Sequence, residues 1–92
     1  MWFIYLKIAV RTIRDRLLKN ERQAIRLLKL YQKIWHQKKV VAVDSSEEKE
    51  LLLSGLVVKR QEHIKVHNRI YQLIFNDNWV DQLLRGYETK AS

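Results

Sequence analysis

Apolar residues recur at helical spacing in the first half of the chain. Between residues 21 and 36, at about 100° per residue, they fall on one wide arc of a helical wheel, opposite a row of cations. The apolar positions on this arc are Ala24, Leu27, Leu28, Leu30, Tyr31, Ile34 and Trp35. Asn20 stands at the N-cap position. The pattern predicts an amphipathic helix here, preceded by residues 8–18 with apolar positions at partly helical spacing.

A second, shorter helix is predicted between Ser45 and Gly55. Ser45 and Glu48 have the spacing of a capping box, and Asp44 with Glu47 offers an alternative register. Gly55 is placed to end this helix, because a residue without Cβ adopts the left-handed conformation that commonly terminates helices.

Two short apolar runs then predict a β-hairpin. Residues 56–58 form its first strand, residues 59–62 a polar turn and residues 63–66 its second strand. Residues 40–43 are also short, apolar and largely β-branched, so we expect them to form another strand or a buried connector.

The last third of the chain is predicted to hold two more helices. Asn68 is placed to cap the first of them, and residues 76–78 interrupt it. Gly86 is expected to end the short last helix, and residues after Tyr87 to fray. The apolar positions in this region are Ile70, Tyr71, Leu73, Ile74, Phe75, Trp79, Val80, Leu83 and Leu84.

This order of elements predicts an α+β fold, mostly helical and of winged-helix type, with a helix-turn-helix, a two-stranded β-hairpin wing and extra C-terminal helices. We expect residues 12–86 to form the domain, residues 1–11 an N-terminal extension of unknown role, and residues 87–92 a tail. The predicted core residues are Leu27, Leu28, Tyr31, Ile34, Leu51, Leu56, Val57, Ile64, Val66, Ile70, Ile74 and Trp79.

Length and composition narrow the setting of this domain. Ninety-two residues suffice for one modest core, and the absence of cysteine excludes disulfides and suits a reducing cytoplasm. The apolar run of residues 1–6 ends at Lys7, well short of the roughly 20 residues that a membrane span needs. They also lack the features of a signal peptide. We expect them to pack on the domain as a short strand or helix; an exposed docking patch is the alternative.

The formal net charge of +8 is concentrated in residues 1–43. Such a basic half favours an anionic partner, although a solvated basic face is equally consistent with it. The candidate anion or nucleic-acid contacts are Arg22, Arg26, Lys29 and Lys33 on the long helix and Lys59, Arg60 and Lys65 in the hairpin. The helix that would enter a DNA groove carries Glu47, Glu48 and Glu50, which argues against ordinary DNA readout.

No arrangement of residues predicts catalysis, a cofactor or a metal site. A phosphate-binding loop needs several glycines before Lys-Ser or Lys-Thr, and the chain has only Gly55 and Gly86. His36, His63 and His67 lie in no ligand pattern. The acidic residues near position 46 are explained by the preference of carboxylates for helix N-termini. We therefore expect a protein that is not an enzyme.

Several stretches resemble the winged-helix region that follows the AAA-like, STAND-type ATPase core in cyanobacterial signalling proteins with WD or tetratricopeptide repeats. They are residues 12–18, residues 26–34, Asp44-Ser45 with Leu51, Leu-Ser-Gly-Leu-Val at 53–57, and Val-His-Asn-Arg-Ile-Tyr at 66–71 leading to Ile74-Phe75-Asn76 and Trp79-Val80. The resemblance covers about residues 12–84. Lys29 and Arg69 stand where the family has glycine and proline.

The resemblance implies a regulatory relay that packs on the nucleotide domain and passes its state to the repeats. The expected partner is therefore a protein, either the ATPase core or the repeat domain, in cis or in trans, and self-association is a further expectation. Nucleic acid is the alternative partner, and no membrane partner is expected. The ATPase core itself is absent from the sequence, so ATP hydrolysis does not carry over to this fragment or free-standing remnant.

Overall fold

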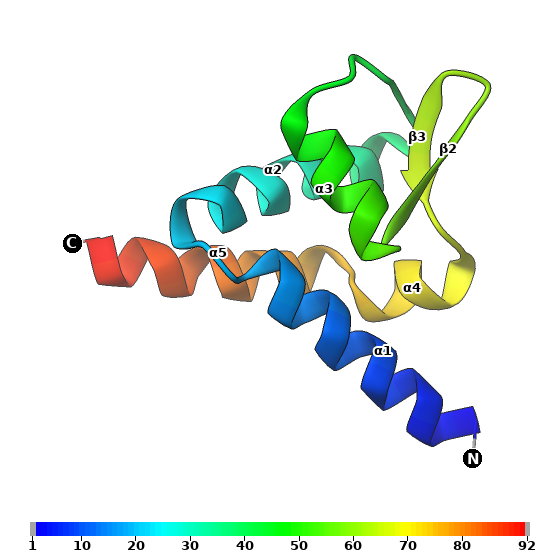
Figure 1. Cartoon of the computed structure of the whole chain (residues 1–92). Helices are drawn as coiled ribbons and strands as arrows, with labels where there is room; N and C mark the ends of the chain where they lie inside the picture. Colours follow the sequence, from blue (N-terminus) through cyan, green and yellow to red (C-terminus); the bar gives the residue numbers. More distant parts are fainter. Residues whose placement is uncertain (1, 92) are drawn as a thin grey trace.

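The computed structural model describes the backbone of residues 2–91 and the side chains of residues 7, 8 and 10–87 (Figure 1). The fold is α+β, with helices predominating over a small antiparallel sheet. The elements in chain order are α1 (Trp2–Leu17), α2 (Glu21–Gln37), β1 (Val40–Val41), α3 (Ser46–Ser54), β2 (Val57–Arg60), β3 (His63–Val66), α4 (Arg69–Ile74) and α5 (Asp77–Ala91).

Helix α2 is the element against which most of the others pack. It contacts α1, α3, α5 and the strands β1 and β3. As predicted, the side chain of Asn20 accepts a hydrogen bond from the backbone N–H of Gln23 at 3.2 Å and so caps its N-terminus. The buried residues of α2 are Ala24, Leu27, Leu28, Tyr31 and Ile34. Its apolar arc therefore forms the centre of the core.

The sheet has three antiparallel strands in the order β1-β3-β2. The predicted hairpin is present, with Val57 opposite Val66 and Arg60 opposite His63. Its turn is confined to Gln61 and Glu62, both with positive φ, whereas we expected residues 59–62. The predicted two-stranded wing also gains β1 as a third strand, because β1 pairs with the free edge of β3.

Helix α3 is held at both ends by the predicted caps. The hydroxyl of Ser45 accepts from the backbone N–H of Glu48 at 3.2 Å, and Gly55 ends the helix in the left-handed region at φ 85°. The second half of the capping box differs, because the Glu48 carboxylate accepts from the backbone N–H groups of Val43 and Asp44, all at 3.0 Å. Glu48 thus fastens the loop before α3.

Two buried or half-buried aromatic residues of α2 fasten the C-terminal helices. The hydroxyl of Tyr31 donates to the carbonyl oxygen of Phe75 at 2.6 Å, and the indole N–H of Trp35 donates to the carbonyl of Gln72 at 2.9 Å. Asn68 caps α4 by accepting from the N–H of Tyr71 at 2.9 Å, as predicted. Helices α4 and α5 therefore belong to the same packed body as α2.

Four aromatic rings also form a row from the end of β3 into α5. His67, Tyr71, Phe75 and Trp79 contact one another in succession, with ring centroids 5.6, 5.8 and 4.7 Å apart and ring planes nearly perpendicular. Edge-to-face packing of this kind is the arrangement that aromatic quadrupoles favour. The row, which we call the aromatic row, links the hairpin to the last helix.

Some core predictions were wrong. Ile70 is 40% exposed, because the short helix α4 turns that side chain away from the body. Eight of the twelve predicted core residues are buried, and Val66, Ile74 and Trp79 pack against them half-buried. The buried apolar residues that we did not place in the core are Ile13, Leu17, Ala24, Val40, Phe75 and Val80.

Both ends of the chain are helical within the described range. Helix α1 runs without a break across the predicted boundary between residues 11 and 12, and it extends away from the sheet toward its N-terminal end (Figure 1). Gly86 does not end the last helix, since α5 continues to Ala91. A glycine interrupts a helix only weakly where no left-handed turn follows it. None of the helices in the described residues has the length and apolar character that crossing a bilayer requires.

Candidate interaction surface

The four predicted cations of α2 form an exposed stripe opposite its buried face. Arg22, Arg26, Lys29 and Lys33 all lie in solvent. Arg26, 68% exposed, pairs with Glu47 of α3 at 3.9 Å. Such a surface pair contributes only about 0–1 kcal/mol, so it leaves the stripe accessible. Within the described residues the other three make no ion pair.

The three predicted cations of the hairpin do not lie on one face. Lys59 stands opposite Ile64, a fully buried residue, so its side chain leaves the sheet on the core side and pairs with Asp44 at 3.5 Å. Arg60 and Lys65 project from the other side, because adjacent residues of a strand point to opposite faces. Of the three candidate contacts in the hairpin, only Arg60 and Lys65 therefore share a face of the sheet.

The solvent-facing side of the sheet collects a different set of residues. Lys39, Arg60, Gln61, His63 and Lys65 line a hollow of about 470 Å³. Val41 pairs with His63 across β1 and β3 and is 63% exposed on the same face. The ring Nδ1 of His63 lies 2.9 Å from the carbonyl oxygen of Gln61, which requires that nitrogen to be the donor. This surface, which we call the basic sheet face, is rich in hydrogen-bond donors.

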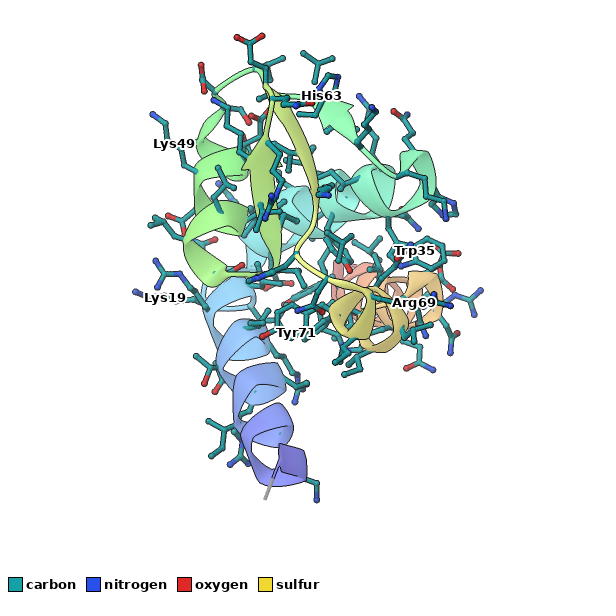
Figure 2. All side chains as sticks on the ribbon, turned by 90° about the vertical axis from the view of Figure 1, so that its right-hand side faces the viewer. Lys19, Trp35, Lys49, His63, Arg69 and Tyr71 are labelled. Atoms are coloured by element: carbon teal, nitrogen blue, oxygen red, sulfur yellow. The ribbon has the colours of Figure 1, made fainter. Side chains whose placement is uncertain are left out.

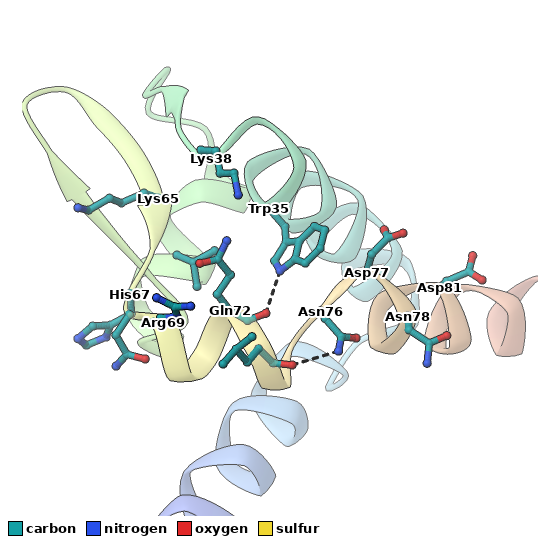
Figure 3. Close-up of a pocket in the computed structure, with 13 residues that line it drawn as sticks. Trp35, Lys38, Lys65, His67, Arg69, Gln72, Asn76, Asp77, Asn78 and Asp81 are labelled. Atoms are coloured by element: carbon teal, nitrogen blue, oxygen red, sulfur yellow. Dashed lines mark hydrogen bonds between the residues drawn. The ribbon is translucent and has the colours of Figure 1, made fainter.

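A larger groove of about 1080 Å³ lies beside the basic sheet face (Figure 3). It runs between the C-terminal end of α2, the end of β3 and helices α4 and α5. Lys38, Lys65 and Arg69 line one part of it, and Asp77 and Asp81 line another. Trp35 also lines it, and Figure 2 places Trp35 and Arg69 on the same side of the body. Lys65 is shared by both hollows.

Asp77 at the start of α5 is held by two side chains of α2. Its Oδ1 lies 3.0 Å from Nε2 of Gln32 and 2.9 Å from Nε2 of His36. The hydrogen bond from Gln32, followed by that from His36, lowers the pKa of the Asp77 carboxyl below its ordinary value. Asp77 therefore gives the groove a fixed negative end.

The acidic helix α3 presents fewer carboxylates than its sequence suggests. Glu48 is 3% exposed and is occupied by the loop before α3, while Glu47 pairs with Arg26. The repulsion of phosphate by this helix, which we inferred from three glutamates, thus rests mainly on Glu50 and the half-buried Glu47.

The three histidines lie apart and are bonded individually. His36 contacts Asp77, His63 contacts the carbonyl of Gln61, and Nδ1 of His67 lies 2.9 Å from the carbonyl oxygen of Gly55. No group of three or more histidine, cysteine or acidic side chains gathers anywhere in the described part of the chain. In the same part of the chain the hydroxyl of Ser46 donates to the adjacent carboxylate of Glu47 at 3.2 Å, an exposed contact at the start of α3 in which no histidine takes part.

Sequence reasoning missed Lys39, His63 and the groove residues Lys38 and Arg69. Lys39 could have been found from the alternation of residues 39–41, had β1 been paired with the hairpin from the start. Lys38 follows the end of α2 and Arg69 begins α4, and only the packing of α4 against the body brings these two residues together. Neither hollow is lined by any residue of the α2 stripe.

Comparison with known proteins places the chain beside one long relative. No protein-family model matches it, and no solved structure matches it. Over 82 residues it is 49% identical to an uncharacterised WD repeat-containing protein of the cyanobacterium Synechocystis. The match takes in 86% of this chain but 7% of that protein. The chain is thus similar to a short segment of a cyanobacterial WD-repeat protein and spans a small fraction of its length.

Proposed function

We propose that this chain is a non-enzymatic regulatory module that binds other protein domains. The observation that carries the proposal is its 49% identity to a segment of a WD repeat-containing protein. A segment that occupies 7% of its relative acts among neighbouring domains, and contact with them is the role that this placement supports.

In its finer form the proposal is a winged-helix relay like the one that follows the ATPase core of STAND-type proteins. The order α2, β1, α3, β2, β3 supports this assignment, because a short capped helix leads directly into an antiparallel hairpin that packs back on a longer helix. The module's partner is the ATPase core or the repeat domain, in cis or in trans, or a second copy of the chain.

The test is association with the Synechocystis WD repeat-containing protein from which the segment matching this chain has been deleted. We expect the purified chain to bind it with micromolar or tighter affinity in calorimetry, and to be displaced by the excised segment as an unlabelled competitor. A chain that binds neither that protein, nor an isolated ATPase core of the family, nor itself would contradict the proposal.

A second candidate function is binding of nucleic acid through the α2 stripe. The exposure of Arg22, Lys29 and Lys33, without ion pairs among the described residues, favours it. Phosphate contacts release counterions, so binding to random duplex DNA must weaken steeply as salt increases. Undetectable binding at low salt removes this candidate.

A further inference from the structure

The basic sheet face carries exposed cations and, at its β1 edge, the exposed apolar side chain of Val41. The register places Val41 of β1 directly opposite His63 of β3, and Arg60 of β2 opposite the same His63. These three residues therefore lie in one line across one face of the sheet. Lys65 lies two residues further along β3 on the same face. Adjacent strands are about 4.8 Å apart, so the line spans roughly 10 Å. That is the scale of a few residues of extended chain.

The charge on this face is not neutralised by its surroundings. The hollow there is lined by Lys39, Arg60, Gln61, His63 and Lys65 and by no carboxylate. Lys39, Arg60 and Lys65 are exposed, and in the described part of the chain none of them makes an ion pair. Lys59, by contrast, is on the core side of the sheet and meets Asp44. The unpaired cations point to an anionic ligand.

We propose that the basic sheet face binds a short acidic segment of the partner protein, with an apolar side chain beside its carboxylates at the β1 edge. The carboxylates meet Lys39, Arg60 and Lys65, and the apolar side chain covers Val41. The proposal rests on the proposed protein-binding function and deepens it by naming the surface and the chemistry of the partner.

The surroundings favour an acidic segment over a nucleic acid. A nucleic-acid strand carries a phosphate at every nucleotide and would continue beyond the face. In the adjoining groove, which shares Lys65, it would meet the carboxylates of Asp77 and Asp81, and at the hairpin turn it would meet Glu62. A short peptide ends before these groups. An exposed valine among the cations also suits a peptide, which supplies apolar side chains, better than a phosphate backbone.

The test compares two charge reversals of equal size. One variant carries Lys39→Glu, Arg60→Glu and Lys65→Glu on the sheet, and the matched control carries Arg22→Glu, Lys29→Glu and Lys33→Glu on α2. The probe is a fluorescein-labelled peptide of aspartate and glutamate with a central valine, followed by anisotropy at physiological salt. We expect the sheet variant to bind at least about tenfold more weakly than the parent, and the control to change by less than about threefold.

Backbone amide NMR adds the location. Addition of the peptide should shift the signals of Val41, Arg60, His63 and Lys65 more than those of the α2 stripe. Equal weakening by the two variants, or shifts confined to α2, would overturn the proposal. If the reversed sheet variant does not fold, the same experiment with glutamine at the three positions decides it.

The two proposals fail in distinguishable ways. Suppose that the parent chain and the sheet variant bind the truncated WD repeat-containing protein equally well. The proposed function then stands, and the acidic-segment site is refuted. A parent chain that binds neither the peptide, nor that protein, nor an isolated ATPase core of the family, nor itself refutes both. If the parent chain binds duplex DNA more tightly than the peptide, and the sheet variant loses that DNA binding, the choice of an acidic peptide as the partner is refuted.

Discussion

The hydroxyl oxygen of Tyr31 lies 2.6 Å from the carbonyl oxygen of Phe75, and both residues are fully buried. Burial raises the pKa of the Tyr31 hydroxyl far above its ordinary value, so the group remains a donor at every physiological pH. The residue at the centre of α2 thereby satisfies the carbonyl of Phe75, the C-cap residue of α4, and sets the point at which the chain turns into α5.

Replacing Tyr31 with phenylalanine should lower the free energy of unfolding by about 1–3 kcal/mol, because the ring volume is kept while a buried carbonyl loses its donor. Urea unfolding measures the change. Tyr87→Phe is the control: Tyr87 is half-buried and no hydrogen bond of its hydroxyl is found in the described structure, so we expect a change within about 0.5 kcal/mol. Similar losses in the two variants would show that the Tyr31 bond contributes little.

The two glycines should respond in opposite directions to alanine. Gly55 has φ 85° with nothing within 4 Å of an added Cβ, so Gly55→Ala should cost about 1–2 kcal/mol from backbone conformation alone. Gly86 lies inside α5, also with open space around it, so Gly86→Ala should stabilise by about 0.5–1 kcal/mol. Thermal unfolding of both variants checks this pair. Destabilisation by Gly86→Ala would contradict the continuous helix.

Removing the Glu48 carboxylate should loosen the loop before α3. Glu48→Ala leaves the N–H groups of Val43 and Asp44 without their acceptor, and we expect a loss of about 1–3 kcal/mol. Glu48→Gln keeps one acceptor oxygen and should lose less. Hydrogen exchange at residues 43 and 44 should accelerate in Glu48→Ala but not in the control Glu50→Gln, and unchanged exchange would rule out the carboxylate as the fastening group.

The lowered pKa of Asp77 predicts a specific dependence of stability on pH. Since folding favours the ionised carboxylate, its contribution is complete above the unfolded value of about 3.9 and is lost as the pH falls through the lower folded pKa. The melting temperature of the parent should therefore exceed that of Asp77→Asn near neutral pH, and the gap should close in acid. If the difference in melting temperature persists at the most acidic pH, its cause is not the ionisation of Asp77.

The sequence was sufficient for local structure wherever one short signal determined an element. The caps at Asn20, Ser45 and Asn68 and the stop at Gly55 were read correctly, because each depends on hydrogen bonds or dihedral angles within a few residues. Gly86 was misread, since a glycine stops a helix only when the following chain departs, and that depends on packing. The exposure of Ile70 likewise depends on how α4 sits against the body, which periodicity over six residues does not determine.

The site was less predictable than the fold. The exposed stripe of α2 follows from helical periodicity alone, and it was predicted. The basic sheet face depends on which strand pairs with β3, because a shift of one residue moves every side chain to the opposite face. Lys39 was missed because its place on this face follows only from the pairing of β1 with β3, and Lys59, expected in the turn, lies in β2. The winged-helix assignment and the identity of the partner stay predictions.

The aromatic row has a consequence for communication within the domain. Nδ1 of His67 bonds to the carbonyl oxygen of Gly55 at the end of α3, and its ring rests against Tyr71, which in turn contacts Phe75. A partner that pulls His67 away from Gly55 must therefore disturb a chain of ring contacts that ends at Trp79 in α5. The row thus gives the hairpin a continuous path of side-chain contacts to α5.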